Sequence, residues 1–197
     1  MPTLKVIHQN NEVINAQVGC RKYHDGSALD TVIAYCLQDC KVPSKLVGSY
    51  GVNINQAAFE MHRLAQAFGK DNGLRLRHMI LSFSDQELKA MRSRAPEYVY
   101  RIADYAARYY GGEYQIIYAV HEDTGRLHAH LVMNTVNYKT GLKYRGDKKD
   151  YYVFQNYLGS FLWNQYGMEL QVVPDREVAP PHLVTGPDLR LDSIRNK

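Results

Sequence analysis

The spacing of apolar positions along the chain predicts a mixture of strands and helices. Alternating or continuous apolar residues predict strands at 3–9, 74–84, 113–122, 127–136 and 168–173. Apolar residues three and four positions apart predict helices at 27–39, 55–68, 86–93, 97–110 and 150–166. A tight turn joins the strands at 113–122 and 127–136, so these two are antiparallel. The pattern indicates an α+β fold, with a central antiparallel sheet and helices packed on it.

Turn and cap residues refine these boundaries. Ser84 and Glu87 form the S-x-x-E pattern of a capping box at the start of a helix. The polar stretch 137–149 carries turn residues and is compatible with a second hairpin. From Pro174 onward the chain has no periodicity, so we expect one folded domain over 1–173. We expect 174–197 to be an exit segment or linker that leads to a C-terminal region absent here.

Composition narrows the class of protein only slightly. The chain has 197 residues, a formal net charge of +4 and 16 tyrosines, which weakly favours a polyanionic partner. It has no apolar run long enough for a membrane span and no secretory leader, which predicts a cytoplasmic protein. Three unevenly spaced cysteines do not form a disulfide framework. Cys36 and Cys40 are placed to share a metal on one helix, although reduced thiols are the simpler interpretation.

The most informative stretch is the predicted hairpin HEDTGRLHAHLVMN, from His121 to Asn134. A four-residue loop at 123–126, with Gly125 supplying the positive φ, places His121 opposite His128. His130 and Asn134 share the parity of His128 and point to the same face. The opposite parity is apolar and predicts a core face, formed by Leu127, Ala129, Leu131 and Met133.

Three converging imidazoles are typical of an open metal site. Neutral His121, His128 and His130 can bind one divalent cation and leave positions free for substrate. Such a cation polarises a phosphate oxygen as a Lewis acid. Two alternatives remain: ordinary hydrogen-bonded histidines, or a closed structural zinc site with a fourth ligand that the sequence does not identify.

This segment resembles the third motif of the MobA/relaxase family of conjugative DNA relaxases, which are HUH endonucleases, in a MOBP-like form. His128-Ala129-His130 corresponds to the HUH triplet. IAYCLQDCK resembles the family's upstream tyrosine motif, with Tyr35 and Lys41. RHMILSFS resembles the second motif, with His78 and Ser82, and the likeness spans roughly residues 25–140. Many family members have N-P-H-x-H, whereas Arg126-Leu127 precede His128 here, so the loop differs.

The resemblance implies a mechanism. Tyr35 attacks a phosphodiester at the nic site of an origin of transfer, which leaves a 5′-phosphotyrosine and a free 3′ hydroxyl. The histidines hold the metal, with Mn²⁺ or Mg²⁺ expected. Glu122 or Asp123 orients a ligand histidine or accepts the tyrosine proton, and the sequence does not choose between them. A phenolate is a better leaving group than an alkoxide, which keeps the exchange reversible.

Other candidate residues have weaker support. Tyr35 also fits the edge of its helix's apolar stripe, and Tyr23 is the reserve nucleophile. Packing and catalysis are equally supported for His78 and Ser82. Both are candidates for DNA contact, with Ser82 expected to bind a backbone phosphate. Asn134 either supports the metal site or bonds nearby backbone. Basic and aromatic residues interleave before the last helix, as in single-strand binders, and the DNA-contact candidates there are Lys143, Tyr144, Arg145, Lys148 and Lys149.

The expected partner is the single-stranded DNA of an origin of transfer, with an adjacent hairpin. An accessory DNA-binding protein and a coupling protein are also expected, and no membrane. One alternative is an HUH nuclease of rolling-circle replication or transposition, with a downstream nucleophile such as Tyr151, Tyr152 or Tyr157. Another is a nucleic-acid binding module that lacks the chemistry.

Overall fold

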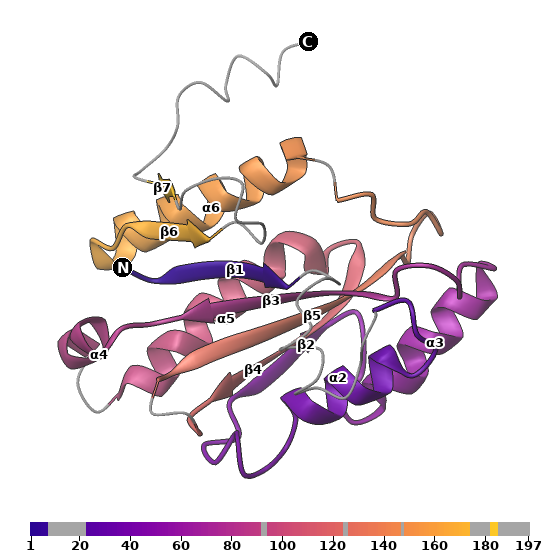
Figure 1. Ribbon diagram of the computed structural model, residues 1–197, viewed down its shortest axis with the longest axis horizontal. Coiled ribbons are helices and arrows are strands. Elements are labelled where there is room, and N and C mark those ends of the chain that lie inside the picture. The colour runs from indigo at the N-terminus through magenta and orange to yellow at the C-terminus, as the bar shows by residue number, and fades with distance from the viewer. Residues whose placement is uncertain (8–22, 92–93, 124–125, 147, 174–181, 185–197) are drawn as a thin grey trace.

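The computed structural model describes residues 1–7, 23–91, 94–123, 126–146, 148–173 and 182–184 (Figure 1). The strands are β1 (Thr3–Ile7), β2 (Val47–Tyr50), β3 (Leu76–Ser82), β4 (Tyr114–His121), β5 (His128–Asn137), β6 (Leu170–Val173) and β7 (His182–Val184). The helices are α2 (Ala28–Cys36), α3 (Ala57–Ala67), α4 (Asp85–Met91), α5 (Ala95–Gly111) and α6 (Lys148–Tyr166).

Within the described residues, the strands form one seven-stranded sheet in the order β2-β4-β5-β3-β1-β6-β7. Every neighbouring pair is antiparallel except β1 and β6, which run parallel. The predicted α+β class and antiparallel centre are therefore confirmed, and the parallel pair is the exception. Local patterning does not reveal that pair, because β1 and β6 lie at opposite ends of the sequence.

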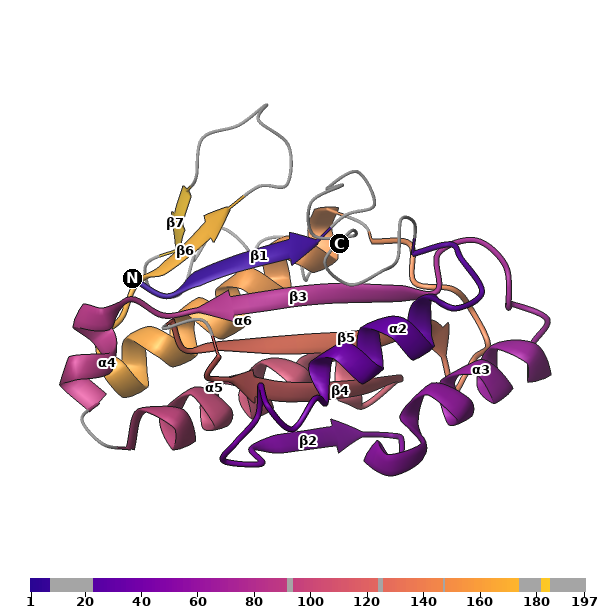
Figure 2. The same cartoon turned by 60° about the horizontal axis from the view of Figure 1, so that its bottom comes forward.

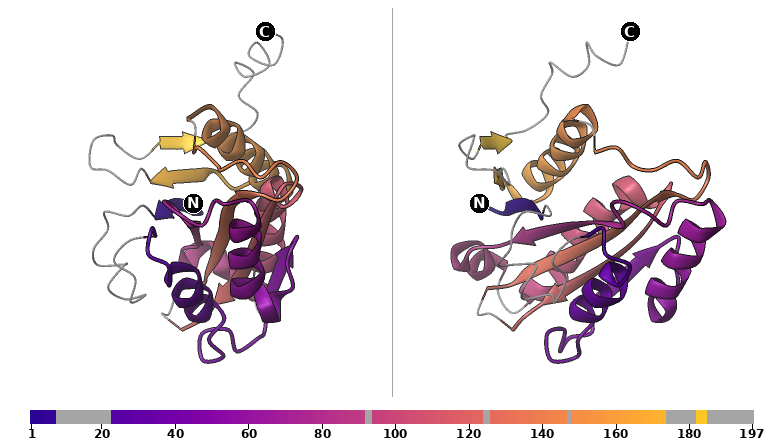
Figure 3. Two further views of the ribbon diagram at one scale, coloured as in Figure 1. Left: turned by 90° about the vertical axis from the view of Figure 1, so that its right-hand side faces the viewer. Right: turned by 45° about the vertical axis from the view of Figure 1, so that its right-hand side comes forward.

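Helices cover both faces of the sheet. Helices α5 and α6 pack on one face and α2 and α3 on the other, which the rotated views show (Figures 2 and 3). Leu131 and Met133 of β5 are buried in the cluster that contains α5. Val132, between them in sequence, is buried in the cluster that contains α2. Alternate residues of one strand thus enter two separate cores, as strand geometry requires.

Many of the tyrosines serve the face covered by α5 and α6. Tyr105 of α5 stacks on Phe161 and Tyr157 of α6, with ring centroids 3.7 Å and 4.3 Å apart. The hydroxyls of Tyr50 and Tyr118 donate to the Asp104 carboxylate at 2.7 Å and 2.6 Å. Packing between α5 and α6 and hydrogen bonds from the strands to α5 therefore explain part of the tyrosine content that composition alone leaves open.

The local signals agree with the structure at most element ends. The capping box is present, because the Ser84 amide and hydroxyl both donate to the Glu87 carboxylate at 2.7 Å and 2.8 Å. The described part of the stretch 137–149 has a turn at 138–140 and one isolated bridge, between Val136 and Lys143, rather than a full second hairpin. Cys36 is buried, Cys40 is exposed, and both are free thiols. Because α2 ends at Cys36, these two cysteines do not share a helix.

Two strands were not predicted. β2 contains Gly48, which favours a break, but a Cβ there would collide with the Tyr118 ring, so the strand needs a glycine. β7 lies inside the segment predicted as loop and pairs with β6. The rest of 174–197, like Cys20 and Gly125, lies outside the described residues. No described helix has both the length and the apolar character needed to cross a bilayer.

Candidate metal and nucleophile site

The β4–β5 hairpin brings the three histidines together. His121 lies directly opposite His128, which confirms the predicted register. His130 pairs with Ile80 of β3, and Ser82 of β3 lies opposite His128. All these side chains share the parity of Val132, so they lie on the face covered by α2 and α3.

The imidazole rings form a compact cluster. The centroids of His121 and His130 are 4.3 Å apart, and His128 lies 5.3 Å and 4.9 Å from them. One ring nitrogen from each histidine lies within 4.8 Å of those of the other two. His121 and His130 are buried, whereas His128 is partly exposed. The cluster therefore has one side open toward solvent.

Hydrogen bonds fix the tautomers of two histidines. The Nε2–H of His121 donates to the carbonyl oxygen of Cys36 at 2.9 Å. The Nδ1–H of His128 donates to the carbonyl oxygen of Arg126 at 2.8 Å. A neutral imidazole carries one proton, so each ring keeps a lone pair on its other nitrogen. Two backbone carbonyls thus prepare His121 Nδ1 and His128 Nε2 as acceptors or metal ligands.

The third histidine is held by another histidine. Nδ1 of His130 lies 2.7 Å from Nε2 of His78, and Nδ1 of His78 lies 2.9 Å from the Tyr23 hydroxyl. When His130 offers a lone pair at Nε2, its Nδ1–H donates to His78. His78 then carries its own proton on Nδ1 and donates to Tyr23. Tyr23, His78 and His130 form what we call the histidine relay.

His78 is fully buried within this relay. The structure therefore argues against the DNA contact predicted for His78, because its side chain has no exposed surface. The strand signal around His78 does not distinguish a residue behind the site from one at the surface.

The buried histidines are neutral at physiological pH. Burial, reinforced by the neighbouring His121 and His128, lowers the pKa of His78 to about 3. Burial also lowers the pKa of His121 and takes the pKa of His130 well below its usual value. Neutral imidazole is the form that binds metal ions.

The unpaired nitrogens provide a direct test of whether a metal fits. Nδ1 of His121 and Nε2 of His130 are buried and have no hydrogen-bond partner among the residues that the structure describes. A buried polar atom without a partner is costly unless something else satisfies it. A divalent cation would satisfy both nitrogens together with His128, so the residues present fit a metal. One potential ligand atom each of Cys36, His78 and His130 also lies within 4.8 Å of those of the other two. Burial raises the pKa of the Cys36 thiol, however, which disfavours the thiolate form that binds metals.

Tyr35 lies directly over this cluster. It occupies the last turn of α2, and its ring centroid is 5.6 Å from those of both His121 and His130. The Lys41 ammonium lies 4.6 Å from the Tyr35 ring centroid. Helix α2 thus brings the predicted nucleophile to the predicted metal ligands, although they are 86 and 95 positions apart in the sequence.

The two neighbouring carboxylates have other partners. Asp123 pairs with Lys41 at 2.5 Å, and Glu122 accepts a hydrogen bond from the Ser44 amide at 3.3 Å. Burial acts to raise the pKa of Asp123, but the hydrogen bond and charge of Lys41 prevail and lower it. Within the described part of the chain, neither carboxylate is hydrogen-bonded to a histidine. Backbone carbonyls and His78 therefore orient the histidines in place of the acids.

The structure places Ser82 beside the histidine cluster but Asn134 away from it. Ser82 is partly buried beside His128, on the face of the cluster. Asn134 is four residues beyond His130, and its amide donates to the Met61 carbonyl at 3.2 Å and the Gln115 side chain at 2.9 Å. Asn134 therefore anchors α3 to the sheet and does not support the cluster. The parity that Asn134 shares with His130 correctly predicted the face of the sheet on which Asn134 lies. It did not predict that Asn134 lies too far along the strand to support the cluster.

The predicted DNA-contact residues lie at the far end of the hairpin. The Lys143 ammonium donates to the backbone carbonyls of Asn72 and Leu74. The Tyr144 hydroxyl donates to Asp150 at 2.5 Å, and Arg145 is exposed. α6 begins at Lys148, whose side chain lies outside the described residues, and Lys149 is exposed. Lys143 and Tyr144 are therefore parts of the fold as well as candidates for contact.

The alternative nucleophiles are poorly placed. Tyr23 is 1% exposed and bonded to His78. Tyr151, Tyr152 and Tyr157 belong to α6, which packs with α5 and β6 on the opposite face of the sheet from the histidines. This geometry disfavours the replication-type arrangement with a downstream tyrosine.

Sequence reasoning missed three features of the site. These are the Lys41–Asp123 pair, the backbone carbonyl of Cys36 and the role of Tyr23 in the histidine relay. Lys41 had a signal, since it was part of the motif that carried Tyr35. A backbone carbonyl has no side-chain signature, and only the fold shows that it faces His121.

Comparisons with known proteins agree with this geometry. Residues 35–161 match the family described as relaxase: MobA/VirD2-like, nuclease domain. Protein rlx of Staphylococcus aureus is 30% identical over 82 residues, which cover 42% of this chain and 24% of that protein. The chain thus aligns with about a quarter of this relative. No solved structure gave a significant match. The family match begins at Tyr35, covers more than half of the chain and includes all three histidines, so the chain belongs to the MobA/VirD2-like relaxase nuclease family.

Proposed function

We propose that this chain nicks one DNA strand at an origin of transfer by tyrosine transesterification. The observation that carries the proposal is the position of Tyr35, with its ring 5.6 Å from His121 and from His130. A tyrosine over a cluster of unpaired imidazole nitrogens combines a nucleophile with a site for an electrophilic metal.

The reaction exchanges one phosphoester for another. The Tyr35 hydroxyl loses its proton, and its oxygen forms a bond to the phosphorus. The bond from phosphorus to the 3′ oxygen breaks, and that oxygen takes up a proton. The phosphate remains on Tyr35 as a 5′-phosphotyrosine, so no energy cofactor is needed, and the reverse reaction rejoins the strand.

The Lys41–Asp123 pair supports the nucleophile. Lys41 lies 4.6 Å from the Tyr35 ring centroid, a cation–π distance that helps to hold the ring over the histidines. The hydrogen bond to Asp123 raises the pKa of Lys41, which keeps the ammonium charged. Asp123 therefore acts on Tyr35 through Lys41. The lowered pKa of Asp123 makes it a weak proton acceptor.

We assign the metal to His121, His128 and His130. A divalent cation bound there would neutralise charge that builds on the scissile phosphate. Imidazole ligands favour a transition metal over Mg²⁺, so Mn²⁺ is the better probe of the two expected ions. We assign to Ser82, which lies opposite His128, a hydrogen bond to a neighbouring phosphate oxygen.

The test is formation of a covalent adduct. Labelled single-stranded oligonucleotides tiled across an origin of transfer are incubated with the protein and Mn²⁺, then run on a denaturing gel. Tyr35→Phe removes the hydroxyl and keeps the ring, and it should abolish the adduct. Tyr152→Phe is the matched control, because Tyr152 is 52% exposed on α6. It should give the wild-type yield, and a chelator should stop the reaction.

The alternatives predict different gels. An adduct that survives Tyr35→Phe but is lost with Tyr152→Phe, or with changes at Tyr151 or Tyr157, would support a replication-type or transposition nuclease. Binding without an adduct on any tile would support a binding module. Peptide mapping of the adduct by mass spectrometry identifies the modified tyrosine directly.

A further inference from the structure

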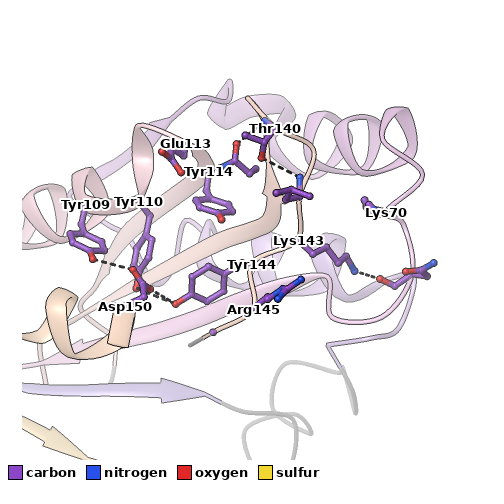
Figure 4. Close-up of a pocket in the computed structure, with 14 residues that line it drawn as sticks. Lys70, Tyr109, Tyr110, Glu113, Tyr114, Thr140, Lys143, Tyr144, Arg145 and Asp150 are labelled. Carbon is purple, nitrogen blue, oxygen red and sulfur yellow. Dashed lines mark hydrogen bonds between the residues drawn. The ribbon is translucent and has the colours of Figure 1, made fainter. Parts of the chain in front are cut away.

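Figure 4 shows the residues that line a cavity of about 920 Å³. The cavity includes Tyr114, at the end of β4 that is opposite His121. It is formed by the loop before β3, the end of α5, the start of β4, the segment that follows β5, and the first turn of α6. This volume is within the range of about 300–1,000 Å³ that is usual for small-molecule and cofactor sites. Nothing in the proposed cleavage reaction uses this cavity.

One wall of the cavity is aromatic. The rings of Tyr110, Tyr114 and Tyr144 meet edge to face, with centroids 5.7–6.5 Å apart and interplanar angles of 78–87°. Tyr110 is buried, whereas Tyr114 and Tyr144 keep exposed surface. Tyr110 and Tyr144 also donate from their hydroxyls to Asp150, which holds the rings in place. The wall is a rigid platform for a flat ligand.

The acidic groups of the cavity have hydrogen-bond partners, whereas two of its cations have no ion-pair partner among the described residues. The Asp150 carboxylate receives hydroxyl hydrogen bonds, and Glu113 accepts one from the Asn137 amide at 2.9 Å. Lys70 and Arg145 are exposed, and neither forms an ion pair among the described residues. The cavity therefore offers unpaired cations beside an aromatic wall, while its acids are already hydrogen-bonded.

The cavity lies at the opposite end of the hairpin that carries the histidines. Tyr114 and His121 are seven residues apart on β4, a separation of roughly 24 Å along a strand. A second cavity, of about 390 Å³, lies between the two sites. It shares Tyr144, Arg145 and Gly146 with the first, and it also includes Tyr23 of the histidine relay. Arg77 lines this second cavity, is 9% exposed and has a buried Nε that no other described residue contacts by a hydrogen bond.

We propose that the larger cavity binds one unpaired nucleotide of the DNA strand, several positions from the scissile phosphate. The base stacks on Tyr114 and Tyr144, and Lys70 and Arg145 bind the phosphates on either side. The inference rests on the proposed function, because its ligand is the same DNA strand. It adds a second anchor that sets the register of the strand relative to Tyr35.

Equilibrium binding tests the cavity without relying on cleavage. The affinity of the protein for a fluorescent oligothymidine and for a matched duplex is measured by polarisation at several salt concentrations, without metal. Tyr114→Leu should weaken single-strand binding about tenfold, the effect of losing one stacked base. Lys70→Gln and Arg145→Gln should each lower the salt dependence by about one counterion. Both lysine and arginine are exposed, so these variants should fold.

Two matched controls lie elsewhere on the surface. Trp163→Leu removes an exposed aromatic ring near the other end of α6, and Arg101→Gln removes an exposed cation from α5. Both should bind as the wild type does. If the cavity variants behave like these controls, the cavity is not a nucleotide site. Equal affinity of the wild type for duplex and single strand would also overturn the proposal, because a stacked duplex base cannot enter the cavity.

Photocrosslinking gives a positive signal that misfolding cannot imitate. An oligonucleotide with 5-iododeoxyuridine should crosslink to Tyr114 or Tyr144, as mapped by mass spectrometry. Crosslinks confined to α2 or the histidine strands would overturn the proposal. The adduct assay distinguishes this failure from failure of the proposed cleavage. If the wild type forms the adduct but the cavity variants bind DNA as tightly as the wild type, only the proposed nucleotide site is refuted. Crosslinks in the cavity without any adduct would support the cavity and refute the cleavage.

Discussion

The two faces of strand β5 are stabilised in different ways. On the face toward α5, Ala129, Leu131 and Met133 are buried by apolar contacts. On the face toward α2, His128 and His130 are each fixed through one ring nitrogen, by a carbonyl and by another histidine. The first face only needs the right volume. The second face needs specific hydrogen-bond partners. The buried Nε2 of His130, which has no partner among the described residues, stays available to bind a metal ion.

Substitutions at two neighbouring residues, Leu131 and His130, should distinguish core packing from metal binding with the largest effects. Leu131→Ala leaves a cavity in the core and should lower the free energy of unfolding by about 2–5 kcal/mol, measured by urea denaturation. The adduct yield per folded molecule should stay unchanged. His130→Gln should lower adduct yield at least about a hundredfold, since it removes one ligand of the proposed metal, and should leave the molecule folded. The comparison fails if both variants lose activity only in proportion to lost folded protein.

The same strand also shows how far the sequence could predict the molecule. Parity placed Leu131 in the core and His130 in the cluster, because a strand has an exact two-residue repeat. It could not place His78 behind His130 or separate Asn134 from the cluster, since those facts depend on the pairing of β3 and the docking of α3. Tyr35 was assigned to the site only through the motif, because helix spacing alone indicates a residue at the edge of the core.

The fold had the same limits. The antiparallel centre followed from tight turns and local periodicity. The parallel contact between β1 and β6 joins Thr3 to Gln171, a long-range choice that no local pattern encodes. β2 was missed because Gly48 is a poor strand former, yet the Tyr118 ring requires a residue without a side chain there.

A smaller effect should come from the histidine relay. His78→Leu removes the acceptor for His130 Nδ1–H, so it should weaken Mn²⁺ binding about ten- to a hundredfold in isothermal titration, the usual effect of losing a residue that orients a metal ligand. His78→Gln keeps an acceptor near the position of Nε2 and should recover part of the affinity. Equal affinities in the two variants would show that His78 only fills space. Near-ultraviolet circular dichroism checks that both variants keep the packed core.

The smallest effect expected is a pH dependence confined to the histidine face. The pKa of His78 is about 3 in the folded protein, whereas an imidazole exposed to water has a pKa of 6.5. The unfolded chain therefore binds a proton first, and stability falls as pH drops below 6.5. For His78 alone the loss should reach about 1 kcal/mol at a pH of about 5.5. Urea denaturation of the metal-free protein at about pH 7.5 and about pH 5.5 measures it. His78→Gln should reduce the difference, because it removes the buried imidazole. A wild-type stability that is flat between these pH values would mean that the buried imidazoles gain protons without cost, which contradicts the burial of the relay.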